Sequence, residues 1–419
     1  MASIPDPLHI AFFNRAYYPE VSATGQLLTE LAEDLVHRHG CRVSVVAGLP
    51  FGVPGAGARW RIVSQERHEG VEIVRAHGTR WSKRTLIGRV SNYLSYFAAA
   101  CAAGRHLDCP RVIVAFTDPP IIGLAAWWVA RRFRAKLVIA YKDLFPEVAR
   151  LVDGRRRPLL EWVLHRVNRF LLRRADQVVA LGEAMRRRLI EEKGANPARV
   201  VVIPDWADAA AIVPGPKGNA FARALGLADR FVVMHAGNLG LSQNLGVLVA
   251  AAAQLADLPD LTVLFLGDGV AKPSLEADVA RRGLRNIRFL PFQPKAQIAE
   301  VFAAADCFVV SLKPGLSGYI MPSKLYSILA AGRPYVAAVD EGCDVARITR
   351  AHECGLLASP GSPDEMATQI RRVYEDRPLG EAMGRRAREA ASAFDRPVSV
   401  RAYYDLCTVV ATRPDGQHA

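Results

Sequence analysis

A proline, a serine and a lysine stand together late in the chain, where an apolar strand pattern gives way to a helix. The strand pattern covers 307–312, a loop containing glycines follows it, and the helix opens at Pro322, Ser323 and Lys324. The first backbone N–H groups of a helix have no partner inside the helix, and the helix dipole favours negative charge there. With an ammonium group beside them, these N–H groups predict a binding site for an anion.

Glycines, amides and an aromatic residue follow other strand patterns, at the ends where parallel sheets bind ligands. A glycine lets the backbone approach a ligand, and an amide side chain offers neutral hydrogen bonds. A single glycine after a strand is more often only a turn, so the prediction of a binding site rests on their succession. The residues are Gly25, Gly237, Asn238, Gln243, Gly267 and Phe292.

Asp143 is the candidate for acid–base chemistry in the first half of the chain, because it follows the strand pattern 136–141. A carboxylate at the end of a strand can orient or deprotonate a hydroxyl group. It can equally cap the turn that follows. The sequence leaves both interpretations open.

Two sets of alternating strand and helix patterns must position these residues. Continuous apolar strands that alternate with amphipathic helices predict doubly wound parallel sheets. We expect an α/β protein with two Rossmann-like domains facing each other across a cleft, the first over 1–206 and the second over 207–397. A last helical pattern at 398–410 is expected to cross back, so that 398–419 joins the first domain. The strand patterns cover 8–14, 42–49, 71–76, 111–117, 136–141, 177–181, 200–203, 231–234, 261–266, 287–290, 307–312, 335–339 and 355–358.

The composition is that of a basic globular protein. The 419 residues carry a formal net charge of +13, and residues 131–200 alone hold 18 Lys or Arg against 8 Asp or Glu. Such a surface suits phosphate groups, nucleic acid or an anionic membrane face, or is simply a soluble basic surface. The seven cysteines show no metal-site spacing, which predicts reduced thiols in a cytosol-like compartment. No apolar run reaches the roughly 18 residues of a spanning helix, and no N-terminal segment resembles a signal peptide.

A helix pattern at 158–174 carries an apolar face and a stripe of cations. Tryptophan among arginines can rest in a lipid headgroup layer, although a solvated basic face with one packed indole fits the pattern as well. A second segment, with Trp81, Lys83, Arg84 and Arg89, repeats the mixture and favours contact with an anionic membrane surface. On the helix, the apolar face holds Leu160, Val163, Leu164, Val167 and Leu171, and the stripe holds Trp162, Arg166, Arg169 and Arg173.

Taken in order, these segments resemble the family 4 glycosyltransferases of the GT-B fold, in the branch that builds bacterial O-antigen, colanic acid and capsular polysaccharides. The resemblance covers nearly the whole chain, and the ordered set of motifs is more specific than any one of them. The motifs are YYPEVSATGQ at 17–26, KDLFPE at 142–147, LGEAMRRRL at 181–189, HAGNLGLSQN at 235–244, FLGDG at 265–269 and MPSKLYSILAAGRPYVA at 321–337.

The resemblance implies a role for each candidate residue in binding a nucleotide-diphosphate sugar, the donor. Pro322, Ser323 and Lys324 would hold the diphosphate, and Lys324 would stabilise the charge of the leaving group. Gly25 would contact the donor phosphate or sugar, Gly237 and Asn238 the diphosphate, Gly267 and Phe292 the nucleoside, and Gly318, Tyr319, Ile320 and the adjoining Met321 the sugar.

Three departures from the family pattern concern charged groups. Asn238 and Gln243 stand where the family commonly has an arginine and a lysine, so Lys324 must supply much of the positive charge. Tyr319 and Ser327 stand where the family has two glutamates, the second of which grips the ribose. The histidine that many members carry near the first-domain strand end is absent, which leaves Asp143 as its substitute.

The resemblance further implies transfer with retention of anomeric configuration, without a tightly bound cofactor or metal. UDP is the expected nucleotide, an N-acetylated hexosamine or deoxyhexosamine the expected sugar, and a lipid-linked or glycan molecule the expected acceptor in lipopolysaccharide or other surface polysaccharide biosynthesis. We expect a cytoplasmic protein on the inner face of the membrane that binds no nucleic acid. The alternatives are a GT-B scaffold that has lost catalysis, an NAD-binding dehydrogenase, and a sugar epimerase on the same fold. The dehydrogenase lacks the third glycine of its fingerprint, since Lys272 occupies that place, and no acid–base pair is placed for an epimerase.

Overall fold

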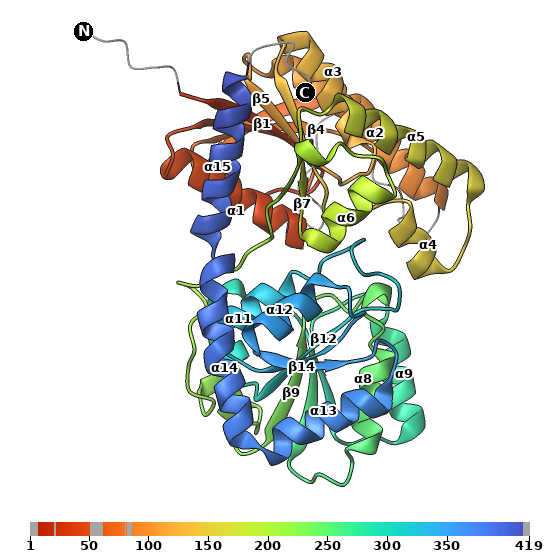
Figure 1. The fold of residues 1–419 in the computed structure, drawn as a ribbon, viewed down its shortest axis with the longest axis vertical. Coiled ribbons are helices and arrows are strands. Elements are labelled where there is room, and N and C mark those ends of the chain that lie inside the picture. The colour runs from red at the N-terminus through yellow and green to blue at the C-terminus, as the bar shows by residue number, and fades with distance from the viewer. Residues whose placement is uncertain (1–6, 21, 51–61, 80, 82–85, 414–419) are drawn as a thin grey trace. The chain divides into compact units, whose positions relative to one another are not determined.

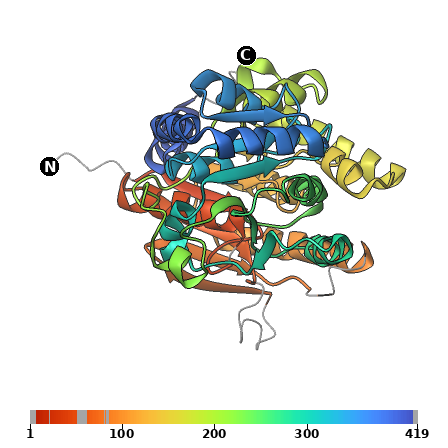
Figure 2. The ribbon, with the colours of Figure 1, turned by 90° about the horizontal axis from the view of Figure 1, so that it is seen from below.

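Two sheets of mainly parallel strands organise the chain (Figures 1 and 2). The structure, a computed structural model, describes residues 7–20, 22–50, 62–79, 81 and 86–413. The described residues form two units: one comprises 7–146, 156–204 and 399–413, and the other comprises 147–155 and 205–398. The predicted α/β class with two Rossmann-like domains is confirmed.

The sheet of the first unit has the strand order β3-β4-β2-β1-β5-β6-β7-β8 within the described residues. All its neighbouring strands are parallel except β3 and β4. The central strand β1 is buried along its whole length, as expected where helices cover both faces of a parallel sheet. The strands are β1 (His9–Phe13), β2 (Arg42–Gly48), β3 (Val63–His68), β4 (Val71–Ala76), β5 (Val112–Phe116), β6 (Lys136–Ala140), β7 (Gln177–Ala180) and β8 (Val200–Val202).

The helices of this unit include α15, whose residues from Ser399 onward belong with the first unit. Tyr404 of α15 stacks on His39, with ring centroids 4.3 Å apart, so the last helix returns to the first unit as the sequence predicts. The helices are α1 (Ala23–His37), α2 (Leu86–Ala103), the short 3-10 helix η1 (Gly104–His106), α3 (Ile122–Phe133), α5 (Pro158–Arg174), α6 (Glu183–Glu191), η2 (Pro197–Arg199) and α15 (Arg396–Thr412).

The sheet of the second unit has the order β11-β10-β9-β12-β13-β14, and every pairing in it is parallel. Its strands match the predicted segments within two residues at each end. They are β9 (Phe231–Ala236), β10 (Leu261–Leu266), β11 (Ile287–Leu290), β12 (Cys307–Ser311), β13 (Tyr335–Ala338) and β14 (Gly355–Ala358).

Alternate side chains of these strands enter two separate cores. Val232 and Met234 of β9 pack on one face with α10, α11, α12 and α14, while Phe231 and Val233 pack on the other with α8, α9 and α13. This period of two is that of a strand covered on both sides. The helices of this unit are α4 (Glu147–Asp153), α7 (Ala220–Ala224), α8 (Gly246–Gln254), α9 (Lys272–Arg282), α10 (Ile298–Ala303), α11 (Lys324–Ala330), α12 (Asp344–His352), α13 (Pro363–Glu375) and α14 (Arg377–Ala391), with the 3-10 helices η3 (Leu241–Gln243), η4 (Lys295–Gln297) and η5 (Ser392–Phe394).

Two features differ from the expected pattern. The antiparallel strand β3 has the sequence VSQERH, and its largely exposed side chains give no apolar run by which to find it. The segment 147–155, which the sequence places in the first domain, belongs with the second unit. There, Lys313 Nζ donates a hydrogen bond to the carbonyl of Val152 (3.2 Å). Among the helices described, none has both the length and the apolar character needed to cross a membrane.

Candidate active site

The loops after β9, β10 and β11 are joined through their main chains. Gly237 N donates to the carbonyl of Leu266, and Gly267 N donates to the carbonyl of Leu290, each at 2.8 Å. Gly267 has φ +143°, and a Cβ placed on it would lie 2.0 Å from the Gly237 carbonyl oxygen. Only glycine fits this position. The structure therefore brings together three of the strand-end loops that the sequence selects.

Lys324, the first residue of α11, reaches the same place from another element. A Cβ placed on Gly237 would lie 3.7 Å from Lys324 Nζ, so the ammonium faces the loop after β9. Lys324 Nζ lies 3.0 Å from His235 Nε2. The His235 ring is fully buried, and its Nδ1 lies 3.4 Å from the Val309 carbonyl. Nδ1–H can donate to that carbonyl, which leaves Nε2 to accept from Lys324.

Burial determines the protonation states of Lys324 and His235. It lowers the pKa of Lys324 to about 7, because removal from water disfavours the ammonium. Burial, and then the neighbouring Lys324, hold the pKa of His235 well below its ordinary value. His235 is therefore a neutral acceptor, and Lys324 can gain or lose a proton near neutral pH. In the sequence His235 stands out only as the first residue of the motif at 235–244, and nothing there indicates its contact with Lys324.

The two residues before Lys324 bond to α11 through their main-chain carbonyls and not through the serine side chain. Ser323 stands at the N-cap of α11, but its hydroxyl makes no capping bond to that helix. Its main-chain carbonyl accepts from Tyr326 N (3.2 Å), and the carbonyl of Pro322 accepts from Leu325 N (3.1 Å). The helix begins at Lys324 and has seven residues, two residues later than the sequence predicts.

Asp340 fixes the glycine-containing loop that precedes α11. Its carboxylate accepts from Gly315 N at 3.0 Å and from Ser317 N at 3.3 Å. Gly318 follows in the left-handed region with φ +75°. Asp340 comes directly after the strand pattern 335–339, so the rule that selected Asp143 could also have selected Asp340.

Of the remaining donor-side candidates, some support the fold and others are exposed. Gln243 Oε1 accepts from Gly240 N at 2.9 Å, so this side chain braces the loop after β9. Phe292 is 55% exposed, and its ring borders Gly267. Tyr319 is buried, Ser327 is half-buried, and Ile320 and Met321 pack on the edge of a core. Asn238 lies beside Gly269: a Cβ placed on that glycine would be 2.7 Å from Asn238 Oδ1.

Gly25 and Asp143 belong to the first unit. The Gly25 N–H, expected to face a ligand, donates instead to the Oγ of Ser22, the N-cap of α1, at 3.3 Å. Asp143 is half-buried in a loop whose Phe145 carbonyl accepts from Asn168 Nδ2 at 2.6 Å. Asn168 is a buried residue of α5, which thus holds the loop after β6.

The cationic stripe of α5 is on the surface. Trp162 is 56% exposed, and the Arg166 guanidinium lies 5.0 Å from the centre of its ring. The predicted apolar face needs correction, because Leu160 and Val163 are exposed. The buried side is narrower and contains Leu164, Asn168, Leu171 and Leu172. Of the second basic segment, Trp81 is exposed, while Lys83 and Arg84 lie outside the described residues.

Two family models match this chain. The glycosyl transferase 4-like domain covers residues 23–206, and the glycosyl transferases group 1 model covers residues 230–376. The 2-deoxystreptamine glucosyltransferase of Streptomyces kanamyceticus is 33% identical over 347 residues, which are 78% of this chain and 84% of that protein. The chain belongs to the family 4 glycosyltransferases. The predicted family is thereby confirmed.

Two other proteins are similar to this chain. The putative colanic acid biosynthesis glycosyl transferase WcaI of Escherichia coli K12 is 29% identical over 206 residues, 48% of this chain and 50% of that protein. HepE of Anabaena, solved with UDP and glucose, has a TM-score of 0.73 at 19% identity and covers 96% of this chain and 100% of its own; the likeness is one of fold. The chain spans about half to two thirds of the length of the first curated relatives that it matches.

Proposed function

We propose that this protein transfers a sugar from a nucleotide-diphosphate donor, preferably a UDP-sugar, with retention of anomeric configuration. The acceptor is a lipid-linked or glycan molecule in surface polysaccharide biosynthesis, such as that of lipopolysaccharide, and the sugar is an N-acetylated hexosamine or deoxyhexosamine. The observation that carries the proposal is Lys324, whose ammonium faces the Gly237 loop where the main chains of two further strand ends meet.

In this proposal the diphosphate occupies the place between Gly237 and the start of α11. Its negative charge restores the proton of Lys324, and the ammonium stabilises the charge that develops as the bond to the sugar breaks. The Ser323 hydroxyl makes no capping bond to α11, so it can donate to a phosphate oxygen. A single ammonium in a partly buried site has a stronger effect than the same charge in water.

In this proposal the sugar, the base and the ribose of the donor each contact a different set of residues. The sugar lies against Gly318, Tyr319 and Ile320, whose loop Asp340 holds in place. Phe292 offers an exposed ring to the base, with Gly267 beside it. Ser327 offers the ribose a hydroxyl in place of a carboxylate, which makes a weaker bond.

The acceptor side rests on the first unit. Asp143 orients the acceptor hydroxyl in this proposal, and the exposed Trp162 with Arg166, Arg169 and Arg173 holds the protein on the anionic inner face of the cytoplasmic membrane. The colanic acid assignment of WcaI and the UDP in the HepE crystals support the choice of polysaccharide and nucleotide.

Calorimetric titration with UDP-, GDP- and dTDP-sugars tests the proposal. We expect saturable binding of a UDP-sugar, weakened at least tenfold by Lys324→Ala and unchanged by Lys295→Ala, which removes an exposed lysine of the same unit. Melting curves show whether both variants fold. Equal affinity of Lys324→Ala and wild type refutes the role of Lys324. Absence of nucleotide-sugar binding by the wild type favours the alternative, a GT-B scaffold without catalysis, which the neutral Asn238, Gln243 and Ser327 motivate.

A further inference from the structure

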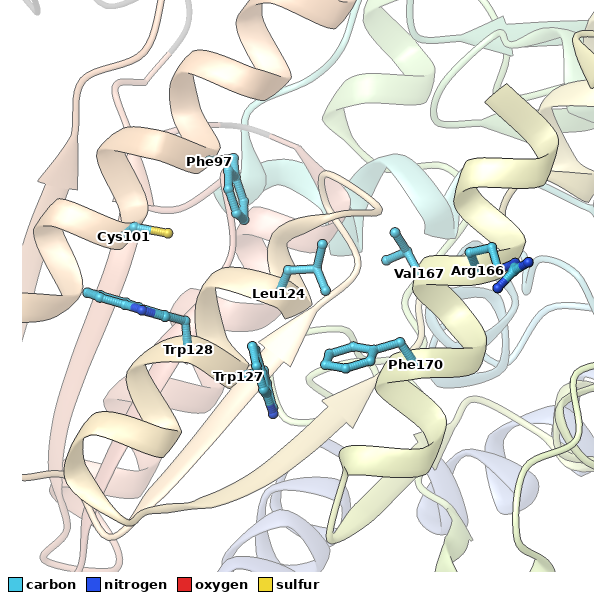
Figure 3. A pocket seen from close by; sticks show the side chains of 8 residues that line it. All are labelled: Phe97, Cys101, Leu124, Trp127, Trp128, Arg166, Val167 and Phe170. Atoms are coloured by element: carbon cyan, nitrogen blue, oxygen red, sulfur yellow. The ribbon is translucent and has the colours of Figure 1, made fainter. Parts of the chain in front are cut away.

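An open apolar groove of about 480 Å³ lies among α2, α3 and α5 of the first unit (Figure 3). Its volume falls within the roughly 300–1,000 Å³ of small-molecule sites. Each of the three helices contributes at least one aromatic or long aliphatic side chain. The lining consists of Phe97 and Cys101 from α2, Leu124, Trp127 and Trp128 from α3, and Arg166, Val167 and Phe170 from α5.

The groove exists because α3 is apolar on both of its sides. Its buried side packs on the sheet through small and branched residues from Ile122 to Ala130. Leu124, Trp127 and Trp128, at i, i+3 and i+4, form the opposite side, where a surface helix ordinarily carries polar residues. Trp127 meets Phe170 edge-on, with ring centroids 4.9 Å apart, and this contact forms one wall.

Arginines stand at the rim of this apolar surface. Arg166 lines the groove at one end, and its guanidinium lies 5.0 Å from the Trp162 ring. At the opposite end, where Trp128 lies (Figure 3), the Arg105 guanidinium lies 5.4 Å from the Trp128 ring. The segment 155–174 contains seven arginines and one acidic residue. Two of the helices carry further exposed apolar side chains: Leu94 on α2, and Leu159, Leu160, Trp162 and Val163 on α5.

We propose that this groove binds the hydrocarbon chain of a phosphate-bearing membrane lipid, with the lipid phosphate on Arg166. The inference rests on the proposed function, since it gives the membrane-side surface a specific ligand. An apolar trough bordered by guanidinium groups complements a molecule with one apolar chain and one anionic end. Guanidinium forks pair with phosphate oxygens, and indole rings favour the boundary between hydrocarbon and headgroup.

Dodecyl phosphate, used below its critical micelle concentration, tests the inference on the intact protein without a nucleotide sugar. We expect saturable binding of about one molecule per chain, and at least tenfold weaker binding of uncharged dodecyl maltoside and of inorganic phosphate. Dodecyl phosphate brominated on its chain should quench tryptophan fluorescence, and Trp128→Phe should remove a large part of the quenching. Trp206→Phe, which replaces a buried tryptophan away from the groove lining, should leave the quenching unchanged.

Two pairs of variants locate the binding. Leu124→Asp in the groove and Arg166→Glu at the rim should each lower the affinity for dodecyl phosphate at least tenfold. Val409→Asp, an exposed valine of α15, and Arg187→Glu, an exposed arginine of α6, should leave it unchanged. Arg166→Glu alters only the surface, so it tests the proposal even if Leu124→Asp fails to fold.

Other outcomes overturn the inference. Binding that appears only with micelles, or that the groove variants do not change, excludes a chain-binding groove. A wild-type dimer that Leu124→Asp converts to a monomer would show that a second copy of the chain occupies the groove instead. Donor titrations on the same variants separate this result from the proposed transferase function, since neither Leu124 nor Arg166 belongs to the donor site.

Discussion

Lys324 Nζ and His235 Nε2 lie 3.0 Å apart at the end of β9, and the imidazole accepts from the lysine. Both groups are shifted toward neutrality: burial lowers the pKa of Lys324 to about 7 and that of His235 well below its ordinary value. Without a ligand, the main cation of the proposed diphosphate site is thus only partly charged at neutral pH.

Donor binding should therefore take up a proton. A bound diphosphate raises the pKa of Lys324. The affinity for the donor should therefore be constant below pH 7 and fall by up to tenfold per pH unit above pH 7, until the pH reaches the raised pKa of Lys324 in the complex. Calorimetry at pH 8 in two buffers of different ionisation enthalpy should show uptake of up to one proton.

Lys324→Arg is the control for that prediction, because arginine remains charged throughout this range. Its donor affinity, whatever its size, should not vary between pH 7 and 9. A wild-type affinity that is flat over the same range would contradict the assigned role of the lysine.

Gly267→Ala should destabilise the second unit by about 1–3 kcal/mol or more, since the residue has φ +143° and the new Cβ would collide with the Gly237 carbonyl. Chemical denaturation measures the effect. Gly246→Ala is the matched control: nothing lies within 4 Å of its Cβ position at the start of α8. That substitution should be neutral or stabilise by up to about 1 kcal/mol. Equal stability of the two variants would refute the close approach of the loops.

Asp340→Asn should lower kcat/KM for the donor sugar by about tenfold, because a weaker acceptor holds Gly315 N and Ser317 N less firmly. The affinity for free UDP should change by less than twofold, since the loop is proposed to face the sugar. Glu341→Gln, at the exposed neighbouring position, is the control. Equal losses of UDP and UDP-sugar binding would place Asp340 elsewhere in the mechanism.

Ser327→Glu should tighten UDP binding by roughly tenfold or more, because a carboxylate accepts from ribose hydroxyls more strongly than a serine does. The gain should vanish with 2′,3′-dideoxyuridine diphosphate, which has no hydroxyl to donate. A gain that persists with the dideoxy compound would mean that the new carboxylate acts away from the ribose.

The apolar strands were predictable because burial on both faces leaves continuous runs such as HIAFF at 9–13. Strand β3 was not, since an exposed edge strand with Gln65, Glu66 and Arg67 resembles a loop in sequence. Lys324 was found because helix-start chemistry is local. Its contact with His235 joins residues 89 positions apart, so local patterns contain no trace of it. Asp340 is the reverse case, because it directly follows a strand pattern and so has a signal in the sequence.

Leu160 and Val163 illustrate a third limit. Helical spacing placed them with Leu164 and Leu171 on one face, but spacing states only which residues share a side, and the breadth of the covering surface decides how many are buried. On α5 only a narrow strip is buried, and Leu160 and Val163 stay exposed.

The main-chain junction at Gly237 and Gly267 has a consequence for how such enzymes diverge. In the proposed donor site these peptide groups form the floor, which holds its shape while the surrounding side chains change, so new donor preferences can arise without rebuilding the scaffold. Enzyme redesign can follow the same division: Asn238, Phe292 and Ser327 are positions to randomise, while the two glycines are positions to leave alone.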